Sequence, residues 1–498
     1  MGAAPAWHER AAALRPDGRC LIDGERRGAA GAAVFAKHSP VDGRLLGEVA
    51  RGGAADIDAA VRSARAAFDD HRWAGKPPAA RKRILVRWSE LVLAAREELA
   101  LLDTLDMGKP IQHALGVDVP ATARCLAWYG EAADKIYDEI APTPASALAL
   151  VTREPVGVIG AIVPWNYPLI MAAWKLGPAL AAGNSVVLKP SEKSPLSALR
   201  LAELALEAGV PPGVLNVVPG FGHEAGEALA LHMDVDAVGF TGSTRTGRRM
   251  LEYAGRSNLK RVHNELGGKS AFIVFDDFDD LPRAARTLAG SIFFNQGESC
   301  NAPSRALLHD SIAERFVEMV ARELPAYQPS DPLLPTTTMG AIVDETQLST
   351  VLRYIAAGRD EGARCIAGGR RVLEASGGCY VEPTIFDGVA GGMTIAREEI
   401  FGPVLSVIRF RTEDEAIRLA NASPYGLQAA VWSDKLSRAH RVARALRAGT
   451  VHVNQYDEDD ITVPFGGFKQ SGNGRDKSLH AFDKVTELKT TWLRIDPA

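Results

Sequence analysis

The spacing of apolar residues changes along the chain. From about residue 54 they recur every three or four positions, as in "DIDAAVRSARAAFDD" and "ARKRILVRWSELVLAAREELALLDTLD", and this spacing predicts amphipathic helices. From about residue 156, short runs rich in β-branched residues end at Pro or Gly, as in "VGVIGAIVP" and "NSVVLKP". Because helical segments such as "LSALRLAELALEAGV" separate these runs, they predict parallel strands joined by right-handed crossovers.

A second series of strand-like runs begins near residue 270. It comprises "SAFIVF", "SRALLH", "VLSVIRF", "LQAAVWS" and "TVHVN", interleaved with helical segments such as "SIAERFVEMVAREL". The chain has 498 residues, which is too long for one ordinary hydrophobic core. Two α/β units are therefore predicted.

Composition and charge narrow the class of protein. A hydrophobic share of 46% and a charged share of 24% are typical of a soluble globular protein, and a net charge of −4 gives no basis for nucleic-acid binding. No secretory signal is visible, and Pro164, Asn166 and Pro168 interrupt the only long uncharged stretch, so no membrane span is expected. Five scattered cysteines without a C-x-x-C pair indicate reduced thiols, a cytoplasmic location and no metal site.

One cysteine stands in an unusual setting. In "SIFFNQGESCNAPSR" an apolar run stops and a polar loop delivers Cys300. A thiol there can act as a nucleophile if backbone amides or a neighbouring base activate it. The alternative is a thiol that merely fills space.

Two further segments indicate a nucleotide site. Lys189 and Glu192 follow the predicted strand in "VVLKPSEKSP", where an ammonium and a carboxylate suit ribose hydroxyls. In "FTGSTRTGRRMLEYA", Gly242 and Ser243 follow a strand, and a helix is expected to open near Thr246 and attract phosphate. The alternatives are a surface ion pair and an ordinary turn, and the G-x-G-x-x-G fingerprint is absent here.

Two polar residues could complete a catalytic site. Asn166 in "VPWNYPLIMAAWK" offers a neutral amide donor for an oxyanion, unless it only caps a turn. Glu265 in "HNELGGKSAFIVF" precedes two glycines and could serve as a mobile general base, unless it is a solvated loop acid.

The order of these motifs resembles one known family. "PWNYP", "KPSE", "FTGST", "ELGGK", "NQGESC", "EEIFGP" and "PFGGFKQSGNGRD" together resemble the NAD(P)-dependent aldehyde dehydrogenase superfamily, over about residues 20–495. Within it, "NVVPGFGHEAG", "FTGSTRTGRRM" and "PFGGFKQSGNGRDKSLHA" are similar to γ-glutamyl-γ-aminobutyraldehyde and 4-guanidinobutyraldehyde dehydrogenases of polyamine and arginine breakdown.

The resemblance implies an α/β fold with three parts. These are a Rossmann-like NAD-binding domain, an α/β catalytic domain and a β-hairpin arm used in oligomerisation, which makes a homodimer or homotetramer the expected state. The implied bounds are 8–141 with 160–266, then 267–477, and finally 142–159 with 478–498.

The resemblance also assigns roles to residues. Cys300 would be the nucleophile, Glu265 the base for deacylation, and Asn166, with the Cys300 amide, the oxyanion hole. Asp476, at a position that is often Glu in relatives, would help relay protons to Glu265. The implied cofactor-binding residues are Trp165, Lys189, Glu192, Gly242, Ser243, Glu399 and Phe401. We expect mainly NAD, with NADP weaker, because the Glu192 carboxylate would repel a 2′-phosphate.

Two other positions depart from the family pattern. Glu298 stands where many relatives have Gln, and a second acid near a thiolate disfavours ionisation unless it faces away or is protonated. Asn264 stands where an apolar residue is usual.

The expected substrate is an aldehyde with an amino, guanidino or γ-glutamylamino group. In "NQYDEDDITVPFGG" four acids follow one another; Asp459 and Asp460, together with Asp118 upstream, are expected to contact that group, whereas the first two acids are expected to be solvated. The methylene chain of the substrate would pack on Tyr167, Met171, Trp174 and Phe465.

Other functions remain open at this point. They are a broad-specificity aliphatic or betaine-type aldehyde dehydrogenase, a CoA-acylating dehydrogenase, a thiol hydrolase that pairs Cys300 with His263, and a non-catalytic family member. The last is disfavoured because the chain keeps both Cys300 and Glu265.

Overall fold

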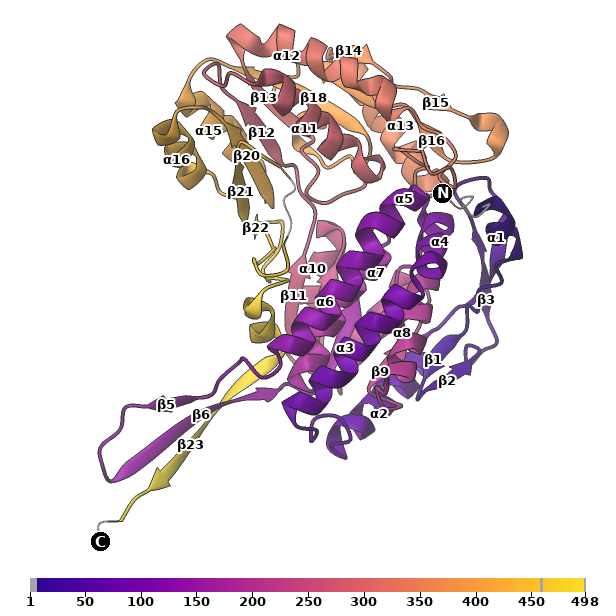
Figure 1. Cartoon of the computed structure of the whole chain (residues 1–498), viewed down its shortest axis with the longest axis vertical. Helices are drawn as coiled ribbons and strands as arrows, with labels where there is room; N and C mark the ends of the chain where they lie inside the picture. The colour runs from indigo at the N-terminus through magenta and orange to yellow at the C-terminus, as the bar shows by residue number, and fades with distance from the viewer. Residues whose placement is uncertain (1–6, 457–459, 497–498) are drawn as a thin grey trace.

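The computed structural model describes residues 7–456 and 460–496. Two α/β lobes and a projecting arm make up the molecule (Figure 1). Among the described residues, no helix is long and apolar enough to cross a membrane. In the same part of the chain, no group of three or more His, Cys, Asp or Glu side chains could hold a metal ion.

The first lobe contains a seven-stranded sheet in the order β11-β10-β7-β8-β9-β1-β2. The strands β11, β10, β7, β8 and β9 are parallel, and β1 and then β2 extend the sheet in the antiparallel sense. In sheet order the strands are Arg261–Glu265, Ala237–Thr241, Val158–Ile162, Ser185–Lys189, Leu215–Val217, Cys20–Ile22 and Glu25–Arg27. Strands β7 and β8 are buried along their whole length, which explains their uninterrupted apolar sequences.

Helices of the first lobe follow the predicted amphipathic segments. The helix pairs α3·α6 and α6·α7 pack closely against each other beside this sheet (Figure 1). The main helices are α2 Ala54–Asp69, α3 Pro78–Ala94, α4 Arg96–Met107, α6 Val119–Ala132, α7 Pro168–Ala182, α8 Leu196–Ala208 and α10 Thr244–Arg256.

The second lobe holds another seven-stranded sheet, in the order β14-β17-β18-β13-β12-β20-β21. All its neighbouring strands are parallel except β14, which pairs antiparallel with β17. In sheet order they are Arg364–Ala367, Thr384–Asp387, Val404–Phe410, Arg305–His309, Ala271–Val274, Gln428–Trp432 and Thr450–Val453. The main helices are α11 Leu281–Phe293, α12 Asp310–Glu323, α13 Glu345–Asp360, α15 Glu413–Asn421 and α16 Leu436–Ala445.

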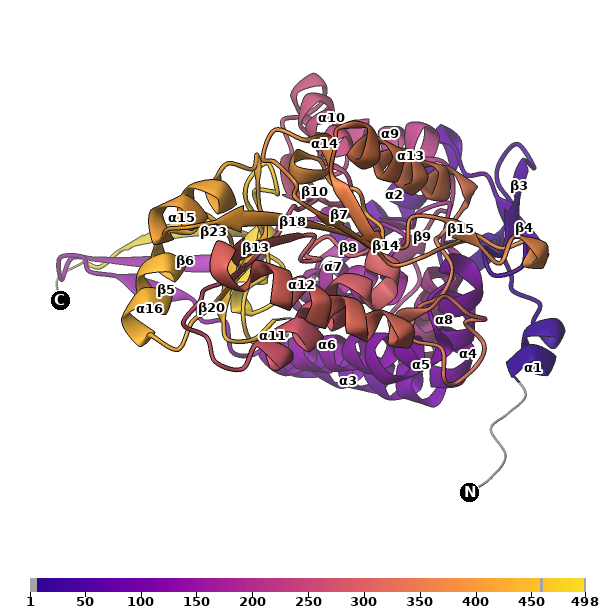
Figure 2. The same cartoon turned by 90° about the horizontal axis from the view of Figure 1, so that it is seen from above.

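The arm is a three-stranded sheet that projects from the body of the molecule in both views (Figures 1 and 2). Strand β6 (Ala147–Pro155) pairs antiparallel with β5 (Glu139–Ala141) on one side and with β23 (Thr486–Arg494) on the other. The pairing of β6 with β23 joins the two distant segments that the family resemblance implied for the arm. Strand β5 lies just before the implied range 142–159, and β7 overlaps its end, so the domain bounds stay a prediction.

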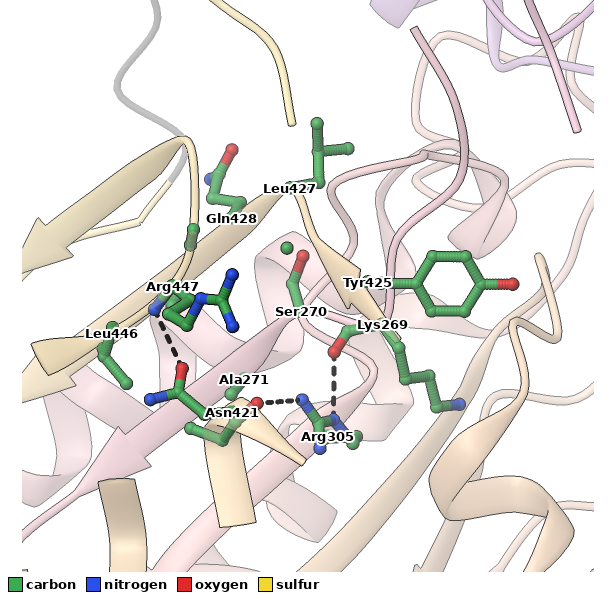
Figure 3. Close-up of a pocket in the computed structure, with 14 residues that line it drawn as sticks. Lys269, Ser270, Ala271, Arg305, Asn421, Tyr425, Leu427, Gln428, Leu446 and Arg447 are labelled. Carbon is green, nitrogen blue, oxygen red and sulfur yellow. Dashed lines mark hydrogen bonds between the residues drawn. The ribbon is translucent and has the colours of Figure 1, made fainter. Parts of the chain in front are cut away.

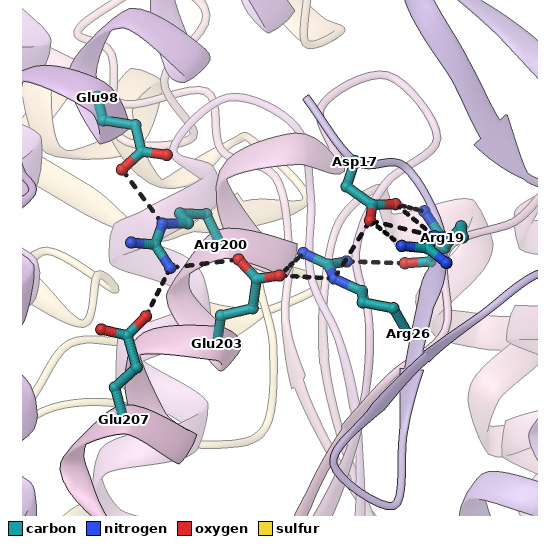
Figure 4. A network of polar contacts seen from close by, with 7 residues as sticks. All are labelled: Asp17, Arg19, Arg26, Glu98, Arg200, Glu203 and Glu207. Atoms are coloured by element: carbon teal, nitrogen blue, oxygen red, sulfur yellow. Dashed lines mark hydrogen bonds and ion pairs between the residues drawn. The ribbon is translucent and has the colours of Figure 1, made fainter. Parts of the chain in front are cut away.

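A polar network fastens the β1–β2 hairpin to the helices of the first lobe (Figure 4). The guanidinium of Arg200 on α8 bonds Glu98, Glu203 and Glu207, and Glu203 in turn pairs with Arg26 on β2. Because these side chains remain partly exposed, each pair contributes little free energy. The network orders an edge of the lobe.

Candidate active site

Cys300 is delivered by a sharply turned loop after α11. Asn295, Gln296 and Gly297 all have left-handed backbone conformations, with φ of 48°, 56° and 71°. A Cβ on Gly297 would collide with the carbonyl of Gly402, so this position requires glycine. The turn ends the helix and carries Cys300 into a pocket of about 370 Å³.

One wall of this pocket is apolar and aromatic. Tyr167, Met171 and Trp174 from the start of α7 line it together with Phe465, and the rings of Trp174 and Phe465 lie 5.2 Å apart. These are the four residues that the family resemblance assigned to the substrate chain. Their positions suit a methylene chain or a ring leading to the Cys300 sulfur.

A second part of the lining, the polar wall, carries hydrogen-bonding groups. Gln428 on β20 lies beside Thr450 on β21 in the sheet register, so its side chain shares a face with His452. The Gln428 Nε2 donates to His452 Nε2 at 3.0 Å, and the Asn301 Nδ2 donates to Gln428 Oε1 at 3.3 Å. Sequence reasoning missed this wall, although polar residues inside the apolar runs "LQAAVWS" and "TVHVN" were a signal for it.

Asn166 lies beside the loop that carries Cys300. The buried side-chain Nδ2 of Asn166 donates to the main-chain carbonyl of Glu298 at 2.9 Å. The main-chain carbonyl of Asn166 accepts from Asn295 Nδ2 at 3.0 Å. An amide nitrogen has two N–H groups, so the second one can serve an oxyanion. The contacts therefore hold the amide next to the nucleophile.

Glu265 ends β11 and is buried, and neither of its carboxylate oxygens has a hydrogen-bond partner among the described residues. Burial, reinforced by the charge of Asp476, raises the Glu265 pKa well above its usual range. A buried acid with unused oxygens is suited to receive a proton from water or from a thiol.

Asp476 does not bond Glu265 directly. Its carboxylate bonds Lys175 at 2.5 Å and also bonds Lys484. Burial opposes ionisation of Asp476, but the two ammonium groups hold its pKa below the usual value. Lys175, which sequence reasoning missed inside an apolar helix, therefore interacts electrostatically with both Asp476 and Glu265.

The Cys300 thiol is protonated in this environment. Burial, together with the charges of Glu399 and Glu265, raises the Cys300 pKa to about 12. A thiolate nucleophile must first lose that proton, so a base such as Glu265 is required near it.

Polar residues stand at the carboxyl ends of β8 and β10 in the first sheet. Lys189 ends β8, and its Nζ lies 3.1 Å from the Glu192 carboxylate. Ser243 caps α10, with its Oγ accepting from Thr246 N, and the helix begins at Thr244 rather than near Thr246. A ribose-binding pair and a helix N-terminus at adjacent strand ends fit a dinucleotide.

Residues from both lobes also meet beyond the carboxyl end of β7. The Trp165 ring stands edge-on to that of Phe401 at 5.1 Å, and Glu399 Oε1 accepts from the Gly268 amide at 2.9 Å. Burial raises the Glu399 pKa to about 7. Behind Gly268, the Arg305 guanidinium donates to the Lys269 carbonyl at the edge of a small pocket (Figure 3), which fixes the chain that crosses between the sheets.

Asp118, expected to contact the substrate, is not one of the residues that line the pocket. Asp118 is fully buried and bonds the Lys109 ammonium, which lies 3.8 Å from the centre of the Tyr167 ring. Its neighbour Val117 lines the pocket instead. Val117 and Asp118 lie in a π-helical turn, Ala114–Asp118. Because successive residues of a helix point in different directions, Val117 reaches the pocket while Asp118 is buried in the protein.

The acids downstream also differ from expectation in part. Asp460 is exposed and accepts from the hydroxyl and amide of Thr462 at 2.6 and 2.8 Å. It is not one of the lining residues, although Val463, a short step along the same turn, is one. Asp459 lies outside the described residues.

Both departures from the family pattern have a structural account. The fully buried Glu298 carboxyl accepts from the Val343 amide at 3.1 Å, and burial raises its pKa well above the usual range. Asn264 Nδ2 donates to the Gly247 carbonyl at 3.1 Å and so joins β11 to α10.

Comparisons with known proteins agree with this geometry. The sequence model of the aldehyde dehydrogenase family matches residues 28–491. NADP/NAD-dependent aldehyde dehydrogenase PuuC of Escherichia coli K12 is 54% identical, with 98% of each chain covered. The crystal structure of an indole-3-acetaldehyde dehydrogenase complexed with NAD⁺ superposes with a TM-score of 0.97 at 61% identity, covering 98% of this chain and 99% of that one.

A third similar protein is the γ-glutamyl-γ-aminobutyraldehyde dehydrogenase of Burkholderia cenocepacia J2315. Its crystal structure has a TM-score of 0.97 at 57% identity and covers 98% of this chain and 99% of its own. The chain belongs to the aldehyde dehydrogenase family. It is an NAD(P)-dependent enzyme that oxidises an aldehyde to a carboxylic acid, which confirms the predicted family, fold and reaction class.

Proposed function

We propose that this enzyme uses NAD to oxidise aldehydes whose tail bears N–H groups, in the form of an amine, a guanidine or a γ-glutamyl amide. The observation that carries the proposal is the mixed lining of the pocket. Its aromatic wall suits methylene groups, and its polar wall of Asn301, Gln428, Thr450 and His452 suits a tail that also forms hydrogen bonds.

In the proposed reaction, Cys300 loses its proton to Glu265 and its sulfur adds to the aldehyde carbon. The Asn166 amide and the Cys300 backbone amide stabilise the oxyanion of the thiohemiacetal. NAD, held by residues such as Lys189, Glu192 and Ser243, would supply the hydride acceptor, and loss of the hydride from the thiohemiacetal carbon leaves a thioester. Glu265 releases this first proton to solvent and then takes a proton from water, whose oxygen attacks the thioester. The C–S bond breaks, Glu265 returns its proton to the Cys300 sulfur, and the product acid loses its own proton to solvent and leaves as a carboxylate. The unpartnered, buried carboxylate of Glu265 supports both of its roles.

The names of similar proteins point to two substrate classes. The Burkholderia enzyme is a γ-glutamyl-γ-aminobutyraldehyde dehydrogenase, which supports an N–H tail. The structure at 61% identity is an indole-3-acetaldehyde dehydrogenase, and the aromatic wall of this pocket would also suit an indole ring. An arylacetaldehyde is therefore the second candidate.

The test compares kcat/KM with NAD for 4-guanidinobutanal, 4-acetamidobutanal, hexanal and indole-3-acetaldehyde. We expect the two N–H tails to exceed hexanal by at least about tenfold, since one satisfied buried hydrogen bond contributes about 1.5 kcal/mol. The highest value for indole-3-acetaldehyde would favour the second candidate. The highest value for hexanal would favour a broad aliphatic enzyme and overturn the proposal.

We also propose that the arm mediates association of identical chains into a dimer or tetramer. Strand β23 carries Leu488 and Trp492 on its surface, with 61% and 66% of each residue exposed, and β5 exposes Ile140. Such apolar side chains on a projecting sheet mark an interaction surface. Light scattering of the wild type and of Trp492→Ser tests this, and a wild-type monomer at micromolar concentration would contradict it.

A further inference from the structure

The loop before Cys300 is held in an unfavourable backbone conformation. Asn295 and Gln296 are non-glycine residues in the left-handed region, each of which costs about 1–3 kcal/mol. Such a conformation persists only where surrounding contacts impose it. The contacts that do so here come from the side chains of Gln296 and Glu298.

Both side chains fasten the loop to one segment, residues 340–343. Gln296 Oε1 accepts from the Gly340 amide at 3.1 Å, and its Nε2 donates to the Ala341 carbonyl at 3.1 Å. Glu298 Oε1 accepts from the Val343 amide, also at 3.1 Å. The segment is itself anchored on the first lobe, because the Ala341 amide donates to the Gly108 carbonyl at 3.0 Å.

The main chain of Glu298 faces the other way, toward the oxyanion hole. Its carbonyl accepts from Asn166 Nδ2 at 2.9 Å and from Asn295 Nδ2 at 3.2 Å. We propose that Glu298 is a positioning residue for the oxyanion hole: its side chain, tied to Val343, fixes the carbonyl that orients the Asn166 amide. This inference rests on the proposed role of Asn166 as the oxyanion donor.

The acid must be neutral to perform this role. The Glu298 carboxyl is fully buried, and burial raises its pKa. The charged groups that face it are Lys193 and Asp344, which pair with each other at 2.7 Å. An ionised Glu298 would add a buried negative charge close to the place where the thiolate and the oxyanion form, and like charges there oppose the reaction.

Two substitutions separate the role of the hydrogen bond from that of the charge. Glu298→Gln keeps an acceptor for the Val343 amide and removes the ionisation. Glu298→Leu removes the acceptor and leaves that amide unpaired. Asp103→Asn is the matched control, because Asp103 on α4 is also a fully buried acid with a raised pKa and takes no part in the site.

We expect Glu298→Gln to keep kcat within about threefold at pH 7, and Glu298→Leu to lose about ten- to a hundredfold in kcat with little change in the Kd for NAD. A wild-type fall of kcat at alkaline pH should disappear in Glu298→Gln and persist in Asp103→Asn. If Glu298→Leu does not fold, the pH profiles of kcat for the wild type and Glu298→Gln still test the inference. Identical alkaline profiles in wild type and Glu298→Gln would overturn the inference.

A double-mutant cycle tests whether Glu298 acts through Asn166. Asn166→Ala should lower kcat by about 10²–10³, and adding Glu298→Leu should then cost almost nothing further. Additive losses would mean that Glu298 does not work through the amide, which overturns the inference alone. An unchanged kcat in Asn166→Ala would instead overturn the proposed oxyanion role on which the inference rests.

Discussion

On the cofactor side of Cys300 the polar residues stand at strand ends and helix starts, whereas on the substrate side they come from loops and from the faces of individual strands. Lys189 ends β8 and Ser243 caps α10. By contrast, Asn301 belongs to a loop, Gln428 lines the pocket from the amino end of β20, and His452 lines it from within β21. The backbone topology thus fixes the first set, and side-chain direction fixes the second.

This difference separates what the reaction needs from what the substrate needs. Under the proposed function, residues at strand ends would act on groups common to every aldehyde and every dinucleotide. Residues of the two pocket walls would meet only the variable tail of the aldehyde. Changes on the first side should therefore affect all substrates equally, and changes on the second side should affect them unequally.

The largest expected effect is that of Cys300→Ala. Without the sulfur no thiohemiacetal forms, so aldehyde oxidation should fall by at least about 10⁴-fold for every aldehyde. NAD should still quench the tryptophan fluorescence, because Trp165 and Lys189 remain. Cys365→Ala, a change at another partly exposed thiol, is the control and should behave as wild type. Turnover of any aldehyde by purified Cys300→Ala would contradict the assignment.

Glu265→Gln should slow deacylation by about 10²-fold, again for every aldehyde. Reduced cofactor should then appear in a burst of about one per active site before a slow steady state. Because the Glu265 pKa is raised and a base acts only when deprotonated, wild-type kcat should climb as pH rises toward that pKa, and the variant should lack this rise. A stopped-flow trace without a burst would show that another group acts as the base.

Asp118→Asn sharpens the comparison, because its effect should fall on stability rather than on specificity. The substitution leaves the Lys109 ammonium buried without its counterion, which costs about 3–5 kcal/mol. We expect a clearly lower denaturation midpoint and an unchanged ratio of kcat/KM between 4-guanidinobutanal and hexanal. A selective loss of kcat/KM for 4-guanidinobutanal would instead indicate that Asp118 contacts the substrate despite its buried position.

The places of Lys189 and Ser243 in the fold could be predicted from the sequence better than that of Asp118, for a physical reason. Apolar runs that end in polar residues mark the carboxyl ends of strands, so the motifs that contain Lys189 and Ser243 could be placed without coordinates. For Asp118, by contrast, a rotation by one residue decides whether the side chain meets the pocket or the core. Lys175 and Gln428 lie inside apolar elements, where the period of the pattern hides single polar positions.

Glu192→Gln should alter the choice of cofactor without altering the choice of aldehyde. The Glu192 carboxylate, held 3.1 Å from Lys189, would repel a 2′-phosphate, and the amide would not. The ratio of kcat/KM for NAD over NADP should fall about tenfold, which corresponds to about 1.4 kcal/mol. Glu207→Gln, at a partly exposed acid on α8, is the control. Equal ratios in wild type and Glu192→Gln would assign the discrimination to other residues.

The smallest expected effect is that of Asp460→Asn, at the rim of the substrate side. The carboxylate is exposed, and the hydrogen bonds from Thr462 lower its pKa, so it carries its charge at neutral pH. Exposed charges attract a cationic tail only weakly and are screened by salt. We expect KM for 4-guanidinobutanal to rise about two- to threefold at low ionic strength, with no change for hexanal.

Raising the salt to about 0.5 M should bring the wild type and the variant together, since the Debye length is then only a few ångströms. Asp483→Asn, at another exposed acid, should leave both aldehydes unaffected. A rise that persists at high salt would mean that Asp460 contacts the bound tail directly, and the substrate side would then extend beyond the two walls of the pocket to its rim.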